Sequence, residues 1–202
     1  MSDGGNPGGG GPRVRLPADD ELQPEVREAL ANLPPLNVFR MVAKLPASFR
    51  PFLQLGGSLL GDEAIDARTR EIAILRVAHV TGAPYEWAQH AQLARSVGVS
   101  DEAIEAIRSD EPEGVLTADE LLVCRAADEI SRDVRLSDEA LQLLIDRYEE
   151  RGACSIILCI AYYNMLSRFL ESTRVPIEPE ELLSGQTPGA FGRGRSAQTA
   201  RR

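Results

Sequence analysis

Two carboxylates and one imidazole, Glu71, Glu86 and His90, have the types and the spacing of an acid–base site. Imidazole changes charge near neutral pH, and neighbouring carboxylates favour its protonated form. Such a group can protonate an enolate-like carbon while a carboxylate orients it or shuttles the proton. The chemistry that these residues predict is proton transfer at a carbon next to a carbonyl, as in an isomerisation, a lactone opening or a cyclisation.

The first helical pattern carries Glu71 on an apolar stripe. Ile74, Leu75 and Ala78 follow Glu71 by three, four and seven residues, which places all four side chains on one face of a helix. A residue on this stripe points toward a core, so we expect an inward-facing carboxylate.

The second pattern carries the other two groups. Glu86, His90, Leu93 and Val97 follow the i, i+4, i+7, i+11 spacing, so the carboxylate and the imidazole lie one turn apart on an apolar face. Between the patterns, Gly82 permits a left-handed helix end and Pro84 suits the first turn of the next helix. Because this break is short, the helices should be antiparallel neighbours, with the first carboxylate able to face the imidazole.

Six further side chains are candidates for the substrate pocket, although each also has a common structural role. An arginine on a helix usually forms a surface ion pair, and a histidine near a helix end often interacts with the helix dipole. Aromatic side chains usually pack in the core, and buried polar groups are usually paired. The six are Arg76, His79, Tyr85, Trp87, Asn164 and Arg168.

Composition limits the possible functions. The chain has 202 residues, 43% of them hydrophobic, which favours one main domain with a substantial core. Its net charge of −9 argues against nucleic acid or an anionic membrane as the main partner. Three cysteines without zinc-type spacing favour a reduced, cytoplasmic compartment, and the apolar run at 153–165 is shorter than the ~20 residues of a membrane span. We therefore expect a soluble cytoplasmic protein.

The two ends of the chain differ from its middle. Residues 1–15 are rich in glycine and residues 185–202 in glycine and arginine, compositions that are typical of disordered tails. A single all-α domain is expected between them, over residues 16–184. Its N-terminal third carries few catalytic residue types, so we interpret that part as a packing or assembly arm.

Helix-start signals are clearest in the second half. Ser100, Thr117 and Ser137 each resemble an N-cap, which predicts helices near 101–108, 118–132 and 138–151. A further helix, at about 153–171, is apolar nearly all round, as expected of a core helix or of one covered by a second subunit. Shorter helices are expected at 22–32, 36–45 and 51–60. No stretch alternates like a strand, so the predicted fold class is all-α with about eight or nine helices.

The same residues resemble a known family. The similarity is to the carboxymuconolactone decarboxylase family, which includes the alkylhydroperoxidase D-like proteins. It rests on Arg70-Glu71, Tyr85-Glu86-Trp87, His90 and Gly98-Val99-Ser100, with His90 19 positions after Glu71. The resemblance covers residues 36–114 and extends to the closing segment AYYNMLSRFLESTRVPIEP. It implies a helical bundle of the alkylhydroperoxidase D-like type, assembled as a trimer or hexamer and acting on a small molecule. We expect no metal and no organic cofactor.

The two branches of this family differ in chemistry. The peroxidase branch has a CxxCxxxH motif, and the corresponding positions here are Ala83, Glu86 and His90, so both thiols are absent. The nearest later cysteine, Cys124, is 34 residues beyond His90. The sequence therefore favours a carboxy-lyase-like enzyme acting on a small carboxylated lactone or keto compound, with Glu71, Glu86 and His90 as catalytic residues. A hydroperoxide-reducing antioxidant protein and a catalytically silent oligomeric binding protein remain the alternatives.

Overall fold

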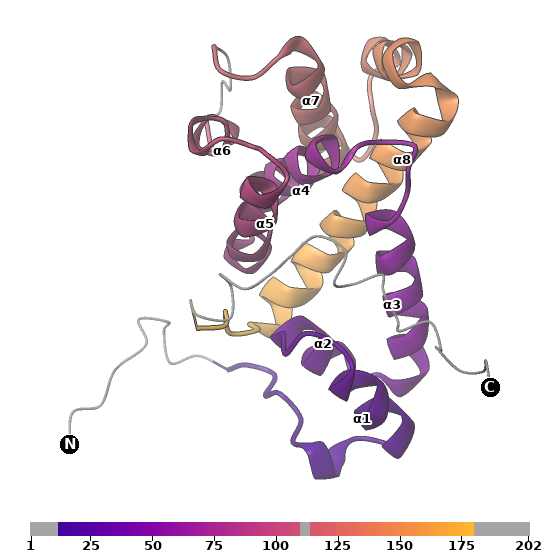
Figure 1. The fold of residues 1–202 in the computed structure, drawn as a ribbon, viewed down its shortest axis with the longest axis vertical. Helices are drawn as coiled ribbons and strands as arrows, with labels where there is room; N and C mark the ends of the chain where they lie inside the picture. Colours follow the sequence, from indigo (N-terminus) through magenta and orange to yellow (C-terminus); the bar gives the residue numbers. More distant parts are fainter. Residues whose placement is uncertain (1–11, 110–113, 180–202) are drawn as a thin grey trace, which may run out of the picture.

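A computed structural model describes residues 12–109 and 114–179, and this part of the chain contains eight α-helices and no strand (Figure 1). The all-α prediction is therefore confirmed. The predicted C-terminal tail at 185–202 and most of the N-terminal tail lie outside the described residues. Residues 12–15, which the sequence assigned to the first tail, lie against the helical body instead, where the Val14 N–H donates to the Thr173 carbonyl at 3.1 Å.

The helices follow one another with short connections. After a 3₁₀ turn at Asp19–Glu21, the order is α1 (Pro24–Ala31), α2 (Asn37–Val42), α3 (Pro46–Leu60), α4 (Ala67–Thr81), α5 (Pro84–Ser96), α6 (Asp101–Ile107), α7 (Ala118–Asp133) and α8 (Asp138–Thr173).

The core is organised around α4, which packs against α5, α7 and α8. Every residue from Arg70 to Ala78 is buried, so this helix is enclosed on all sides. Figure 1 shows α8 crossing the molecule from the α7 end to the α2 end, with α3 beside it. The first three helices meet α8 near its C-terminal end, where Phe169 packs against their buried residues.

Local sequence signals explain where several helices begin. The hydroxyls of Ser100, Thr117 and Ser137 accept hydrogen bonds from the backbone of α6, α7 and α8, which confirms all three predicted caps. Gly82 ends α4 in the left-handed conformation at φ 62°, and Pro84 opens α5. The predicted break between the two site helices is therefore present.

Two predicted boundaries were wrong. The α3 helix begins at Pro46 rather than near Pro51, because proline fits the first turn of a helix, where its missing N–H costs little. The helices predicted at 138–151 and 153–171 are both present within α8, but the break between them lies at Glu149, at φ 57° and ψ 170°, a few residues before the predicted position. Beside this break, Gly152 leaves room for close approach of the chain, since a Cβ there would lie 3.3 Å from the Ala64 carbonyl oxygen.

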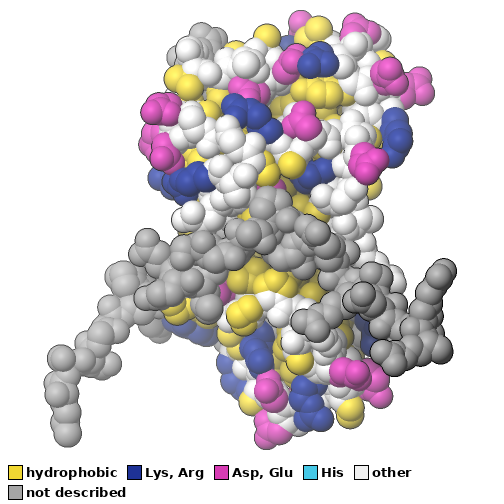
Figure 2. Space-filling model, viewed as in Figure 1, with side chains coloured by type: hydrophobic (Ala, Val, Ile, Leu, Met, Phe, Trp, Pro, Cys, Tyr) yellow, Lys and Arg dark blue, Asp and Glu magenta, His cyan; other side chains and the backbone are white. Residues whose placement is uncertain are grey.

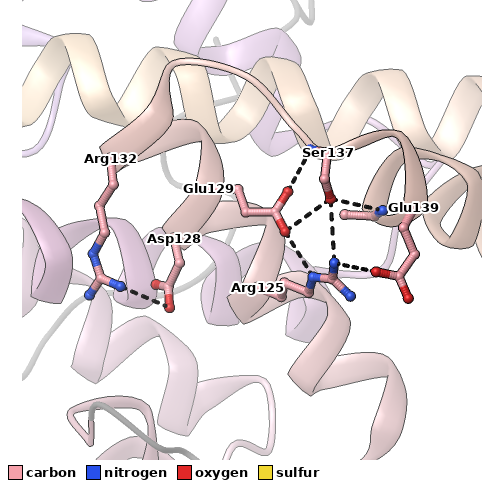
Figure 3. Close-up of polar contacts among 7 residues, drawn as sticks. Arg125, Asp128, Glu129, Arg132, Ser137 and Glu139 are labelled. Carbon is pink, nitrogen blue, oxygen red and sulfur yellow. Dashed lines mark hydrogen bonds and ion pairs between the residues drawn. The ribbon is translucent and has the colours of Figure 1, made fainter.

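A polar cluster holds the end of α7 against the start of α8 (Figure 3). The Glu129 carboxylate accepts from the Ser137 backbone N–H at 2.7 Å and from the Arg125 guanidinium at 2.8 Å. Arg125 also donates to Glu139 at 2.8 Å. These contacts fix the turn between the helices.

The surface and the longest helix add two facts about the whole molecule. Figure 2 shows acidic and basic side chains mixed over the described part of one face. By length and composition α8 could cross a membrane, but 61% of its most apolar stretch is buried inside the fold, as in the core helix of a soluble protein.

Candidate active site

The structure brings Glu71, Glu86 and His90 together. His90 Nδ1 lies 2.7 Å from Glu71 Oε2, and His90 Nε2 lies 3.5 Å from Glu86 Oε2. All three side chains are buried, with exposed fractions of 5%, 3% and 6%. The imidazole therefore has a carboxylate at each ring nitrogen, one of them at close hydrogen-bond distance.

The antiparallel pair α4 and α5 positions these groups. Glu71 comes from the first turns of α4, which Asp66 caps by accepting from the Thr69 N–H at 2.7 Å. Glu86 and His90 lie one turn apart on α5. The contact between Glu71 and His90 across the two helices is the one that the spacing predicted.

The α8 helix contributes an aromatic contact to the imidazole of His90. The ring of Tyr163 stands edge-on to the ring of His90, with 4.9 Å between centroids and 87° between planes. Tyr162 meets Tyr163 in a similar way at 5.4 Å. Such pairs fix ring orientation, so His90 is held by packing as well as by its hydrogen bond.

A cavity of about 60 Å³ opens beside Glu86 and His90. One water needs ~10–15 Å³ by this measure, so there is room for a few waters or a small organic group. Tyr85, Gln89 and Tyr162 are among its polar lining side chains, and the rest of the wall is largely apolar. The cavity therefore suits a small molecule.

Burial and mutual charge shift the protonation of the site. Burial raises the pKa of Glu86 to about 7; the nearby His90 opposes this shift, while Glu171, Glu71 and Glu178 add to it. Burial alone would lower the pKa of His90, but the Glu71 charge and hydrogen bond, together with Glu86, raise it above its ordinary value. The site thus combines a carboxyl that titrates near neutral pH with an imidazole that favours its charged form.

Glu178 is a buried carboxylate that sequence reasoning missed. It accepts from the Tyr85 hydroxyl at 2.6 Å, from the Gln89 side chain and from the Asn37 backbone N–H. The Tyr85 hydroxyl in turn accepts from the Val38 N–H at 3.0 Å. Tyr85 and Gln89 are four residues apart, and this spacing is the signal that could have revealed a polar face on α5.

Of the six candidate pocket residues, Tyr85 is the one that lines the cavity. Arg76 is fully buried and makes a two-point ion pair with Asp128 at 2.6 and 2.7 Å, and it also donates to the carbonyl of Ile107 at 2.8 Å. Arg76 therefore ties α4 to α7 and does not face the cavity. His79 lies in the last turn of α4, away from the cavity wall.

Trp87, Asn164 and Arg168 also lie away from the cavity. The guanidinium of Arg108 stacks over the Trp87 ring at 4.2 Å from its centroid. Asn164 donates to the Ser131 hydroxyl at 2.8 Å, and its backbone carbonyl accepts from Arg168 at 2.9 Å. These polar groups are satisfied within one chain, so their pairing requires neither a substrate nor a subunit contact.

The N-terminal third contributes more than packing. Val38 and Phe39 of α2, together with Phe52 and Leu53 of α3, line the cavity. Interpreting this region as only a packing or assembly arm was therefore wrong. Apolar wall residues carry no catalytic signature, and only the folded chain shows which of them surround a site.

The cysteines lie outside the cavity wall. Burial raises the pKa of both Cys124 and Cys159 to about 12, whereas Cys154 is exposed. A thiol held in its neutral form is a poor nucleophile. Within the described ranges no group of three His, Cys, Asp or Glu side chains is arranged to hold a metal ion.

Comparisons with known proteins agree with this architecture. The model of the carboxymuconolactone decarboxylase family matches residues 46–129, which include α4, α5 and the three site residues. No curated protein matches the chain.

Solved structures resemble the fold at low sequence identity. The alkylhydroperoxidase AhpD core of an uncharacterized peroxidase-related protein from Ralstonia eutropha JMP134 aligns with a TM-score of 0.75 and 16% identity, covering 87% of this chain and 97% of that one. An uncharacterized peroxidase-related protein from Silicibacter sp. TM1040 gives 0.74 and 17%, covering 87% and 95%. A protein of unknown function from Agrobacterium tumefaciens gives 0.65 and 18%, covering 69% and 97%.

The fold is that of the alkylhydroperoxidase D-like helical proteins. The family model adds a local similarity to the carboxymuconolactone decarboxylase family over the segment that holds the two site helices. At the two positions where the resemblance would place the redox pair, this chain carries Ala83 and Glu86.

Proposed function

We propose that this protein is a cofactor-independent acid–base enzyme that moves a proton at a carbon next to the carbonyl of a small lactone or keto compound. The observation that carries the proposal is His90 held between Glu71 at 2.7 Å and Glu86 at 3.5 Å, at the wall of a small cavity. The local match to the carboxymuconolactone decarboxylase family is consistent with decarboxylation or a related isomerisation.

Each residue has a distinct role in this chemistry. His90 is the proton donor, because its pKa is raised and its charged form is held by Glu71. Glu86, with a pKa of about 7, is suited to accept a proton from carbon and to return it, since a base works best when its pKa lies near the operating pH. Glu71 orients the imidazole through Nδ1 and leaves Nε2 for the reaction.

The proton balance of the isomerisation route is simple. Glu86 takes a proton from the carbon beside the carbonyl while His90 gives one to the carbonyl oxygen, which forms an enol. Return of a proton to a different carbon, and of the oxygen proton to His90, gives the isomer with the site restored. In the decarboxylation route, loss of CO2 leaves the enolate, and His90 supplies the proton.

The test is a panel of lactones and keto acids, with CO2 release and solvent deuterium uptake as readouts. We expect His90→Ala and Glu86→Gln to lower turnover by about 10²–10⁴-fold, the usual contribution of a positioned acid or base. His79 is the second histidine of the chain and does not line the cavity. His79→Ala is therefore the matched control and should retain activity.

A catalytically silent binding protein would give a different pattern. The same substitutions would then mainly lower the melting temperature, because each removes a buried hydrogen-bond partner. Absence of any signal that depends on His90 over the whole panel would contradict the enzymatic proposal for these compounds.

A further inference from the structure

The charge of the cavity wall bears on which substrate it accepts. The wall combines apolar side chains from four helices, including Phe39 of α2, Leu53 of α3, Leu93 of α5 and Leu166 of α8. Within the part of the chain that the structure describes, no lysine or arginine lines this cavity. The positive group at the wall is His90, which is already paired with Glu71.

The arginines that might have met a substrate carboxylate are engaged elsewhere. Arg76 is fully buried against Asp128, on the side of α4 that faces α7. Arg168 donates to the Asn164 side chain at 2.5 Å and to its carbonyl at 2.9 Å. Neither guanidinium borders the cavity.

Negative groups surround the same space. Glu71 and Glu86 flank the imidazole, and Glu178 lies behind the wall, where it accepts from Tyr85 and Gln89. Two buried carboxyl groups therefore contact the imidazole, and a third lies behind the same wall. A carboxylate bound beside them would lose its hydration and meet their charge without a cation of its own.

Glu86 indicates how this environment affects a carboxyl group. Although its Oε2 lies 3.5 Å from His90, burial and the charges of Glu171, Glu71 and Glu178 raise its pKa to about 7. A substrate carboxylate placed in the cavity would experience the same burial and the same charges.

We infer that the part of the substrate that enters the cavity carries no negative charge, so that the site takes an uncharged, largely apolar lactone or ketone. This inference rests on the proposed acid–base function and narrows it. It favours isomerisation or lactone opening over decarboxylation, since an uncharged compound has no carboxylate to lose. The carboxylated substrate expected from the sequence is correspondingly disfavoured.

The experiment compares a five-membered lactone that bears a carboxylate with its methyl ester, by isothermal titration calorimetry on the full chain at pH 7. We expect the ester to bind about tenfold more tightly or better, given the cost of burying an unpaired carboxylate. Equal or tighter binding of the carboxylate would overturn the inference, and so would failure of both compounds to bind.

A charge-removing variant sharpens this test. Glu178→Gln should reduce the ratio of the ester affinity to the carboxylate affinity by about threefold or more, because it removes one of the buried negative charges. Glu105→Gln removes one negative charge from an exposed position on α6 and should leave the ratio of the two affinities unchanged. The wild-type comparison needs no variant, so the inference stays testable even if Glu178→Gln does not fold.

Solvent deuterium uptake by the bound ester separates this inference from the proposed function. Preferential binding of the ester with uptake that depends on His90 supports both. Preferential binding without uptake supports the charge preference and contradicts the acid–base function for that compound.

Discussion

At the scale of single residues, the sequence predicted the three residues of the candidate site better than their surroundings. Glu71, Glu86 and His90 come together because they lie on two adjacent helices whose phase the sequence fixes locally. Glu178 could not be found in this way, since it lies 89 residues from Gln89 in the chain and meets it only through the tertiary fold. Side chains that act through long-range contacts carry no local periodicity.

Arg76 provides a prediction about stability rather than catalysis. Replacing it with methionine removes the partner of a part-buried Asp128, so Arg76→Met should cost about 3–5 kcal/mol of unfolding free energy. Urea denaturation measures this loss. Arg132→Gln is the control, because Arg132 is half-exposed and lies 3.7 Å from the same carboxylate, and it should cost at most about 1 kcal/mol. Equal effects of the two variants would contradict the role of Arg76 as a structural tie.

Glu86 provides a prediction about pH. Its carboxyl ordinarily titrates near 4.5 but is raised to about 7 in the folded chain. Between these values the folded state holds a proton that the unfolded state releases. Stability should therefore fall as pH rises through this window, by a total on the order of 3 kcal/mol, and level off above it.

Glu86→Gln tests this linkage, because glutamine cannot titrate. Melting temperatures of the wild type and the variant, measured from pH 5 to pH 8, should show the variant gaining relative to the wild type as pH rises. Parallel curves would show that Glu86 titrates at its ordinary value.

At the scale of helices, capping residues gave the most accurate predictions of where helices begin. Ser100, Thr117 and Ser137 begin their helices as predicted, because a cap depends only on residues within one turn. The two errors concern α3, which begins at Pro46 and continues through Pro51, and α8, whose break lies at Glu149 rather than near residue 152. Whether a helix ends or continues there depends on its packing, which local sequence does not contain.

Val134 provides a prediction at this scale. It ends α7 in the left-handed conformation at φ 71° with its side chain 87% exposed, so a branched residue occupies a position that suits glycine. Val134→Gly should stabilise the protein by about 1 kcal/mol, as measured by urea denaturation. Val134→Ala keeps a Cβ and should gain less. A loss of stability with glycine would contradict the strain at this position.

At the scale of the whole molecule, the last helix connects the site to the surface. Its buried face carries Tyr163 against His90, whereas Leu158 and Met165 are about half exposed on the opposite side. The homo-oligomer expected from the sequence, a trimer or hexamer, stays a prediction, and this exposed apolar face is where we propose that a second copy would pack. The cytoplasmic location and the absence of a cofactor also stay predictions.

The central claim is that His90 is a charged imidazole poised between Glu71 and Glu86. Nuclear magnetic resonance titration of the ring nitrogens tests it most directly, and the chain has only two histidines to assign. We expect the pKa of His90 to lie above 6.5 in the wild type and to fall in Glu71→Gln, because the Glu71 charge and hydrogen bond hold the proton. A pKa of His90 below 6.5 that Glu71→Gln leaves unchanged would contradict the claim.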